Sequence, residues 1–470
     1  MLFNSYTFLF GFLPAVLVGF ACCARWTTPR WTMLFLVAAS LVFYGWWDWR
    51  YVPMLGGSIA FNYLWAGLLQ RAGAAAPRRL LLGVGIAANL ALLGYFKYAN
   101  FLVANLDGLL RLGWSFDRIA LPLAISFFTF EQITYLVAAH RRELPAHGAL
   151  HYAVFLTFFP RLIAGPIVRP AEILPQLTAP GPRPAGPLTI DAGNLAEGLF
   201  VFAIGLFKKA VLADTFSPWV GPIFDQGAVP PLIDAWGAAL AFALQIYFDF
   251  SGYTDMAIGL ARMFGIRLPE NFDSPYQARS IAEYWRRWHI TLSSFLRDYV
   301  YIPLGGNRHG ELRTTLNLIL TMLIGGLWHG ANWTFVLWGA VHGALLSLQR
   351  AWQRTGRALP GPLAWALTFL AVVIALVLFR APTFERASVM LAGLVGAGGF
   401  AWDSGPHAFD THEWKRLLPA LALVLWAPNR QAIVAWRWES DTAYALAFIT
   451  LMVVSIFCFG EPTPFVYFQF

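Results

Sequence analysis

The stretch from Thr314 to Leu348 limits the possible folds more than any other part of this chain. It is almost wholly apolar, yet His329 lies near its middle. As one continuous helix, its 35 residues would reach about 50 Å at 1.5 Å per residue, well beyond a hydrocarbon core of about 30 Å. The stretch therefore predicts either one strongly tilted helix or two helices that meet near Gly325, Gly326 and Gly330, because glycine tolerates a break or a close approach. In both cases His329 lies inside the hydrophobic layer, where an ionisable side chain is by default a functional candidate.

A second histidine, His289, lies in the segment from Glu283 to Asp298. Read as one helix, this segment places its aromatic and leucine side chains on one face and its charged side chains mostly opposite. His289 falls on the rim of the apolar face, close to Trp285. Such a helix either anchors at a membrane surface or covers a cavity inside the protein. Two histidines 40 residues apart, each flanked by tryptophans, favour the second alternative.

The composition is that of an all-α, polytopic membrane protein, because 58% of the residues are hydrophobic and only 12% are charged. No long hydrophilic stretch is available for a soluble domain, so we expect residues 1–470 to form one membrane domain with a catalytic region near 245–345. The net charge of +8 is explained by loop arginines, and no nucleic-acid motif is present. The three cysteines form no ligand pattern, and zinc, P-loop and dinucleotide motifs are missing. We therefore expect no metal and no permanently bound cofactor.

Apolar runs near 20 residues predict about 11 to 13 membrane segments, including re-entrant or tilted ones. The odd-numbered loops of the first half are basic, and the even-numbered loops are balanced in charge. By the positive-inside rule the odd loops are cytoplasmic and the N-terminus is outside. A Pro/Gly-rich link is expected at 180–187. The predicted segments are 2–23, 31–49, 53–70, 80–104, 118–139, 149–168, 196–213, 234–262, 314–348, 362–380, 385–400, 416–427 and 443–460.

Other polar groups lie within apolar runs. For Asp249 and Asp255 we expect structural ion pairs, because buried carboxylates are usually paired; the candidate partners are Arg262, Arg286 and Arg287. Arg161 lies between two prolines, which indicates a bent or broken segment that lines something polar. His342 is interpreted as a packing histidine, and His140, His147 and His151 as surface residues rather than metal ligands.

Buried histidines at this depth suit acyl transfer. Neutral imidazole is the natural general base near pH 7, and burial keeps it neutral by disfavouring the cation. Such a base, acting on a hydroxyl beside an activated acyl donor, needs no covalent enzyme intermediate. This fits a chain without a Gly-x-Ser-x-Gly nucleophile elbow.

These motifs also resemble those of the membrane-bound O-acyltransferase family (MBOAT), most closely its bacterial alginate O-acetyltransferase branch. The resemblance extends over nearly the whole chain, and its tryptophan–histidine motifs are specific. Arg161 departs from the family pattern, since a neutral residue such as glutamine is expected there. The matching segments are Asp249–Gly259, Tyr284–Ser293, Arg297–Gly306 and Gly325–Trp333, together with Leu162–Ile167 and Phe465–Phe470.

The resemblance implies an MBOAT fold around a central tunnel in a bacterial inner membrane. It implies that His329 is the essential catalytic residue and that His289 assists. The donor would be a cytoplasmic thioester, acetyl-CoA or another acyl carrier. The acetyl group would pass to a periplasmic SGNH-type partner that decorates an exopolysaccharide such as alginate. The residues expected to contact the substrates are Trp285, Trp288, Trp328, Arg286, Arg287 and Asn332.

Two alternatives stay open at this stage. One keeps the family but changes the acyl group, giving D-alanyl transfer to teichoic acid from a carrier-protein thioester. The other is a proton-coupled transporter or flippase that uses the histidines as a proton relay. Many transporters have repeated halves, and no internal repeat is found here.

Overall fold

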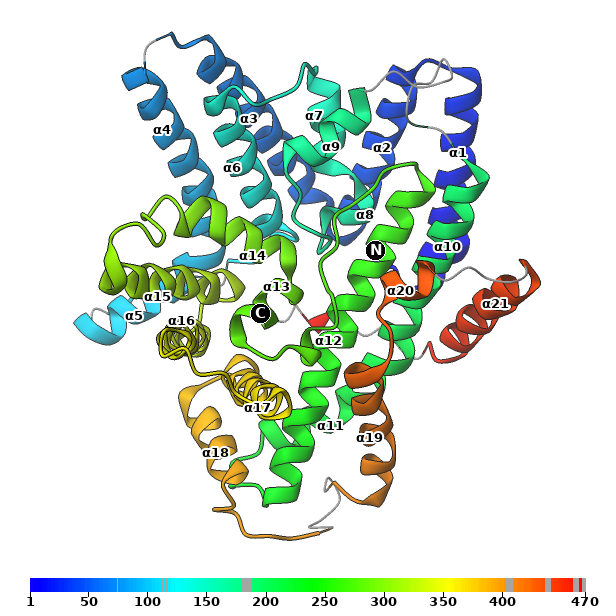
Figure 1. The fold of residues 1–470 in the computed structure, drawn as a ribbon. Coiled ribbons are helices and arrows are strands. Elements are labelled where there is room, and N and C mark those ends of the chain that lie inside the picture. Colours follow the sequence, from blue (N-terminus) through cyan, green and yellow to red (C-terminus); the bar gives the residue numbers. More distant parts are fainter. Residues whose placement is uncertain are drawn as a thin grey trace. The chain divides into compact units, whose positions relative to one another are not determined.

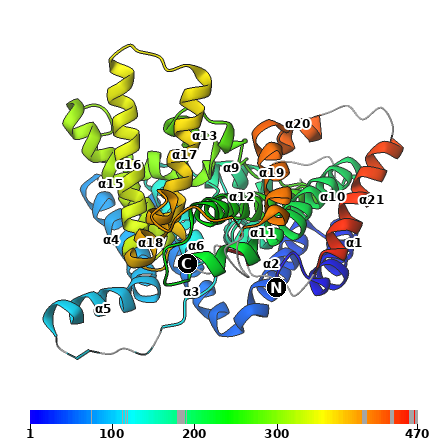
Figure 2. The ribbon, with the colours of Figure 1, turned by 90° about the horizontal axis from the view of Figure 1, so that it is seen from below.

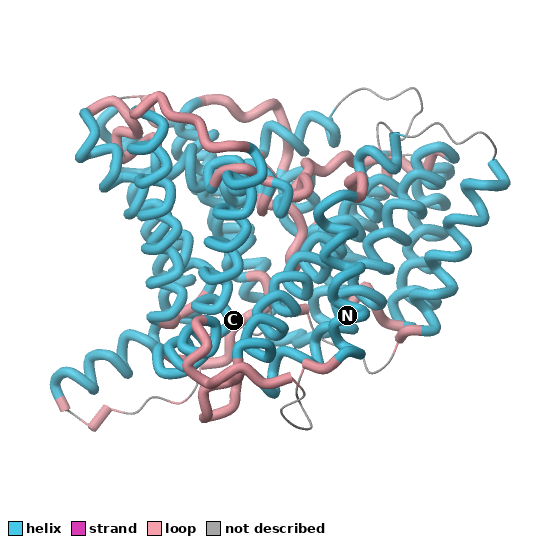
Figure 3. Tube along the Cα trace, turned by 60° about the horizontal axis from the view of Figure 1, so that its bottom comes forward, coloured by secondary structure: helices cyan, strands magenta, loops and turns pink. Residues whose placement is uncertain are grey.

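A computed structural model describes the chain apart from residues 74, 112, 115–116, 118, 179–187, 189, 403–408, 436–440, 460–464 and 467–470. The described part is built from helices and connecting loops and contains no strand (Figure 3). This confirms the all-α prediction. The expected link at 180–187 and the last four residues of the Phe465–Phe470 motif lie outside the described residues.

The chain divides into two compact units, which are described one at a time. The first unit comprises Met1–Gly205 and Tyr253–Pro269. Its helices are η1 (Thr7–Phe12), α1 (Leu13–Trp26), α2 (Pro29–Asp48), η2 (Trp49–Tyr51), α3 (Val52–Arg71), α4 (Ala75–Leu93), η3 (Gly94–Tyr98), α5 (Ala99–Leu110), α6 (Ile125–Arg141), α7 (Ala149–Thr157), α8 (Phe159–Leu162), α9 (Pro170–Thr178) and α10 (Ala192–Phe207).

The second unit comprises Leu206–Gly252 and Glu270–Phe470. Its helices are η4 (Lys208–Ala213), α11 (Asp214–Phe224), η5 (Pro275–Gln277), α13 (Ile281–Arg287), α14 (Ile290–Leu296), η6 (Arg297–Tyr301), α15 (Gly310–His329), α16 (Trp333–Arg354), α17 (Gly361–Arg380), α18 (Phe384–Leu394), α19 (Thr411–Trp426), α20 (Arg430–Ala435) and α21 (Asp441–Phe457). The long helix α12 (Leu232–Met263) contributes residues to both units.

Five helical stretches of the described chain are long and apolar enough to cross a membrane. This agrees with a multi-pass membrane protein. The prediction of one span at 149–168 is wrong, because this segment is divided into the short helices α7 and α8 and a loop after them. The five stretches are Thr7–Trp26, Pro29–Arg71, Ala76–Leu110, Leu232–Met263 and Gly361–Arg380.

In the first unit, α3, α4 and α6 pack side by side (Figure 1). A buried ion pair joins Arg161 on α8 to Glu131 on α6, and both residues are at most 4% exposed. The break predicted around Arg161 is therefore present, and its guanidinium faces a carboxylate. The guanidinium also lies 5.0 Å from the centre of the Phe155 ring.

In the second unit, α15 and α16 form a closely packed pair, and α17 packs next to α16 (Figure 2). Of the two alternatives for the 314–348 stretch, the structure has two helices, which are interrupted at Gly330–Asn332. Glycines allow the helices to approach closely, because a Cβ on Gly339 would lie 2.3 Å from the carbonyl oxygen of Met322.

The segment from Glu283 to Asp298 is not one helix, so that prediction is wrong. It forms α13 and α14, with Trp288 extended and His289 left-handed at φ 42° and ψ 55°. The break has a tertiary cause. The Asp273 N–H donates to the Arg287 carbonyl, and the Ile290 N–H donates to the Asn271 carbonyl, so a neighbouring segment takes up backbone groups on either side of the break.

Candidate active site

His329 is placed by the end of α15. It is the last helical residue, and the chain continues through the extended Gly330 to Asn332. The side chain of Asn332 accepts a hydrogen bond from the Thr334 N–H over 3.1 Å and so caps α16. A Cβ on Gly330 would lie 2.3 Å from the Phe335 ring, so the turn requires glycine there. The sequence thus fixes the position of His329 with one cap and one glycine.

The imidazole of His329 is enclosed by aromatic rings. Its centre lies 5.0 Å from that of Trp328, 5.1 Å from that of Trp338 and 5.1 Å from that of Phe379. The residue is 4% exposed. The imidazole is therefore shielded from water by aromatic rings on several sides.

His289 is completely buried between α13 and α14. The Phe250 ring packs edge-on against it, with 4.7 Å between ring centres. Burial lowers the pKa of His289 to about 3, so the ring is neutral at neutral pH. Its left-handed backbone is unusual for a residue with a side chain, and strained positions of this kind cluster at functional sites.

The hydrogen bonds around Asn271 fix which nitrogen of His289 carries the proton. Three groups converge on Asn271 Oδ1: the Thr291 N–H at 3.2 Å, the Thr291 hydroxyl at 2.9 Å and His289 Nδ1 at 3.1 Å. An amide nitrogen cannot accept a backbone N–H, so this atom is the oxygen and His289 Nδ1 donates to it. In the neutral ring the basic nitrogen is therefore Nε2.

One indole ring contacts both histidines. The centre of the Trp328 ring lies 5.9 Å from that of His289 and 5.0 Å from that of His329. The two histidines predicted from the sequence thus belong to one buried cluster of the second unit, with Trp328 in contact with each.

The cluster continues to a third histidine. His342 on α16 lies 4.7 Å from the Trp338 ring, and the Trp285 indole N–H donates to His342 Nδ1 over 3.3 Å. His342 is therefore a hydrogen-bonded packing residue, as expected. Trp285 reaches this end of the cluster from α13, rather than lying beside His289 as a continuous helix would place it.

Of the remaining residues predicted to contact substrates, three have local partners. Trp288 is buried and stacks on Tyr284, with 5.7 Å between ring centres. Arg287 pairs with Glu283 over 2.9 Å, and Arg286 is exposed. The side-chain amide of Asn332 donates to the Pro382 carbonyl over 2.8 Å, in addition to capping α16. Substrate contacts by these four residues stay predictions.

Sequence reasoning did not identify Asn271, Phe250, Trp338 or Phe379 as parts of this cluster. Two of them had a signal: Trp338 lies nine residues after His329 and four before His342 in the same apolar run, and Phe250 lies in the matching Asp249–Gly259 segment. The others come from segments distant in the sequence, and no periodicity connects them to the histidines. Within the described residues, no three His, Cys, Asp or Glu side chains are grouped to hold a metal ion.

The ion pair expected for Asp249 is present, but the prediction of its partner is wrong, because none of the three proposed arginines forms it. Asp249 pairs with Lys209 over 2.7 Å, while Arg262 pairs with Glu197 over 2.8 Å. The second carboxylate oxygen of Asp249 accepts the Val466 N–H over 2.8 Å. Asp249 thus ties a residue near the C-terminus to α12, directly beside Phe250.

Together these features define a multi-pass helical membrane protein with a buried histidine pair in its second unit. Residues 88–379 match the MBOAT, membrane-bound O-acyltransferase family. The chain therefore belongs to the membrane-bound O-acyltransferase family and is an acyltransferase, as its motifs indicated.

Its relatives include proteins named for O-acetyl transfer and proteins named for D-alanyl transfer. A peptidoglycan O-acetyltransferase of Helicobacter pylori is 43% identical over 429 residues, covering 85% of this chain and 80% of the relative. The probable alginate O-acetylase AlgI of Pseudomonas aeruginosa is 44% identical over 411 residues, covering 85% and 75%. A teichoic acid D-alanyltransferase of Bacillus subtilis is 26% identical over 270 residues, covering 54% and 65%.

Proposed function

We propose that this enzyme transfers an acetyl group from a cytoplasmic thioester, acetyl-CoA, for the O-acetylation of an extracytoplasmic polysaccharide such as alginate. The observation that carries the proposal is the buried pair of His289 and His329 around Trp328. The choice of acetyl over D-alanyl rests on the relatives, because those named for acetyl transfer are far more similar over far more of the chain.

In the proposed reaction, His329 accepts the proton of the acceptor hydroxyl as its oxygen attacks the thioester carbonyl. A C–O bond forms, the C–S bond breaks, and the proton passes from the imidazolium to the departing thiolate. A neutral, desolvated imidazole is suited to the first step, since it is an acceptor at neutral pH. His289 holds the acceptor or donor through Nε2, because its Nδ1 proton is engaged by Asn271.

The proposal also includes a route for the acetyl group across the membrane. A tunnel open to both faces of an inner membrane, with the N-terminus outside, would let a cytoplasmic donor and an outer acceptor meet at His329. A periplasmic SGNH-type partner would then carry the acetyl group to the polymer. The peptidoglycan and alginate relatives are named for polymers outside the cytoplasm, which supports this direction.

The test measures free CoA released from acetyl-CoA by the purified full-length enzyme, together with acetylation of cell-surface polymer. His329→Ala should abolish both while the protein stays inserted in the membrane. The matched control is His412→Ala, because His412 is exposed on α19. Polymer acetylation retained by His329→Ala would remove this residue from the mechanism. Turnover of a D-alanyl carrier thioester in place of acetyl-CoA would overturn the choice of acyl group.

A further inference from the structure

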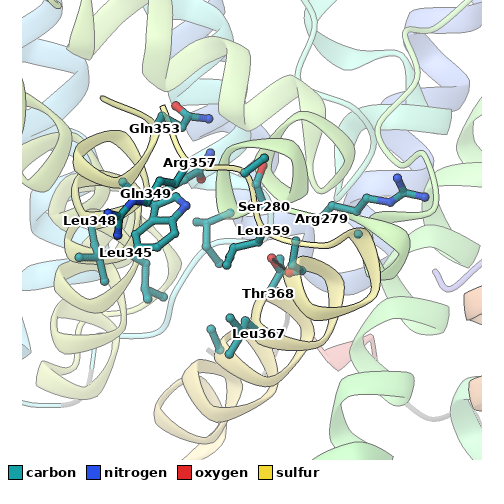
Figure 4. A pocket seen from close by; sticks show the side chains of 16 residues that line it. Arg279, Ser280, Leu345, Leu348, Gln349, Gln353, Arg357, Leu359, Leu367 and Thr368 are labelled. Carbon is teal, nitrogen blue, oxygen red and sulfur yellow. Dashed lines mark hydrogen bonds between the residues drawn. The ribbon is translucent and has the colours of Figure 1, made fainter. Parts of the chain in front are cut away.

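A groove of the second unit lies away from the histidine cluster, between α16, α17 and the start of α13 (Figure 4). Its volume is about 640 Å³, within the usual range of small-molecule sites. At one end it is lined by polar side chains, among them Arg279, Ser280, Gln349 and Arg357. Further along, its walls are leucines.

The leucines of the groove face the surroundings of the protein. Leu348 is 68% exposed and Leu367 is 51% exposed, and they come from the two helices that form its walls. Large exposed apolar side chains on neighbouring helices of a membrane protein face hydrocarbon. The groove is therefore open to lipid along its side and polar at its end.

The charge at the polar end is positive and uncompensated. Arg350 and Arg354 are neutralised by Glu311, at 3.1 Å and 2.5 Å. Arg279 and Arg357, by contrast, form no ion pair among the described residues; the Glu283 carboxylate accepts the backbone N–H of Arg279 over 2.8 Å and pairs with Arg287. The sequence has no acidic residue between Glu311 and Glu385, so none in α16, α17 or the loop between them offsets the charge of Arg357. Basic loops are cytoplasmic, and basic pockets between helices on that side bind anionic lipid headgroups.

We propose that this groove binds an anionic phospholipid, with its phosphate at Arg279 and Arg357 and an acyl chain along Leu345, Leu348 and Leu367. Figure 4 shows Gln349, Leu345 and Leu348 along α16, with Arg357, from the loop that follows this helix, on the same side of the groove. The amphipathic ligand matches the amphipathic lining. A guanidinium and a phosphate form a charge-assisted hydrogen bond, which is stronger than a neutral one.

Binding at this place would support the histidine cluster indirectly. The side-chain oxygen of Gln349, on the groove wall, accepts the Ala282 N–H over 2.8 Å and so joins α16 to the first turn of α13. The same helix, α13, carries Trp285, which donates to His342. A lipid that fills the groove would hold α13, α16 and α17 in this arrangement, so the site is a structural one.

The test uses the purified full-length protein in nanodiscs of phosphatidylcholine alone or with phosphatidylglycerol. Native mass spectrometry measures bound lipid, and thermal unfolding measures stabilisation. We expect preferential retention of phosphatidylglycerol and a higher unfolding midpoint in its presence. Replacing both Arg279 and Arg357 by Gln should weaken retention by roughly tenfold or more, since two charge-assisted contacts are lost. Arg308→Gln, an exposed arginine next to the start of α15, should leave retention unchanged.

Four outcomes would overturn the proposal. Equal retention of both lipids would show that the groove does not select charge, and an equal loss in Arg308→Gln would indicate a diffuse surface effect. Displacement of phosphatidylglycerol by CoA would make the groove an entrance for the donor. Stabilisation by inorganic phosphate alone, equal to that by the lipid, would reduce the site to an anion site without a role for the leucines.

Discussion

Gly326 on α15 and Gly339 on α16 face each other where the two helices are closest: a Cβ on Gly326 would lie 3.2 Å from the Gly339 nitrogen and 2.2 Å from the Phe335 carbonyl oxygen. These atoms belong to backbone and cannot rotate away. The close approach holds His329, three residues after Gly326, against Trp338, one residue before Gly339.

We therefore predict that Gly326→Ala separates α15 from α16. Overpacking of this kind costs about 1–3 kcal/mol or more. The unfolding midpoint of the detergent-purified protein should fall, and CoA release should fall with it as His329 moves from Trp338. The neighbouring Gly325→Ala is the control, because its Cβ would meet only the flexible end of Leu296, at 3.0 Å. Equal effects of the two substitutions would show that the helix contact does not depend on these glycines.

A second prediction concerns His289. His289→Asn should retain more CoA release than His289→Ala, because an amide can keep a hydrogen bond to Asn271 or to substrate and asparagine tolerates the left-handed backbone better than alanine. The initial rate of each purified variant with acetyl-CoA is the measurement. Equal loss in both variants would indicate that a titrating group is required at this position.

The ion pair of Arg161 and Glu131 gives a third prediction. Two of the three guanidinium nitrogens of Arg161, Nε and Nη2, are buried without a hydrogen-bond partner, so the carboxylate is its main compensation. Glu131→Gln should lower the free energy of unfolding by about 3–5 kcal/mol, because it leaves a buried charge unpaired. The double variant with Arg161→Gln should recover most of this loss. The unfolding midpoints of the single and the double variant measure this loss and its recovery.

The partly exposed pair of Arg262 and Glu197 provides the matched control. The Glu197 side chain is 40% exposed, so Glu197→Gln should change stability by no more than about 1 kcal/mol. A double Arg161/Glu131 variant as unstable as Glu131→Gln alone would show that shape, rather than charge, makes this pair important.

The sequence reduced the 314–348 stretch to two alternatives, one tilted helix or two helices, and the structure has the second. The apolar length of the stretch exceeds a bilayer, and glycines occur where the chain turns. It also predicted that Asp249 is paired, because burial of a carboxylate requires a partner. Both are consequences of local composition, which can be evaluated without knowing the fold.

Periodicity failed where distant segments decide the local structure. The helix expected through His289 is broken because Asn271 and Asp273, more than ten residues earlier, bind the backbone around the break. Lys209 pairs with Asp249 across forty residues, and Val466 lies more than two hundred residues away from it. A side-chain pattern contains no information on such pairings, so the partners suggested by proximity in the sequence were wrong.

The last prediction starts from the C-terminal end of the chain. Phe465 is buried, and its ring centre lies 5.5 Å from that of Phe250, which in turn lies 4.7 Å from His289. The adjacent Val466 N–H is held by Asp249. Phe465 is therefore a positioning residue: it supports the Phe250 ring, which packs against His289.

Phe465→Ala should remove that support and lower kcat for CoA release several-fold, with KM for acetyl-CoA nearly unchanged, because the donor still binds while His289 is less well oriented. Phe465→Leu should restore part of the rate by refilling the space beside Phe250. Phe457→Ala is the control, since Phe457 is 86% exposed on α21. A fall in the amount of folded protein with unchanged kcat per molecule would show that Phe465 only stabilises the fold and does not act on His289.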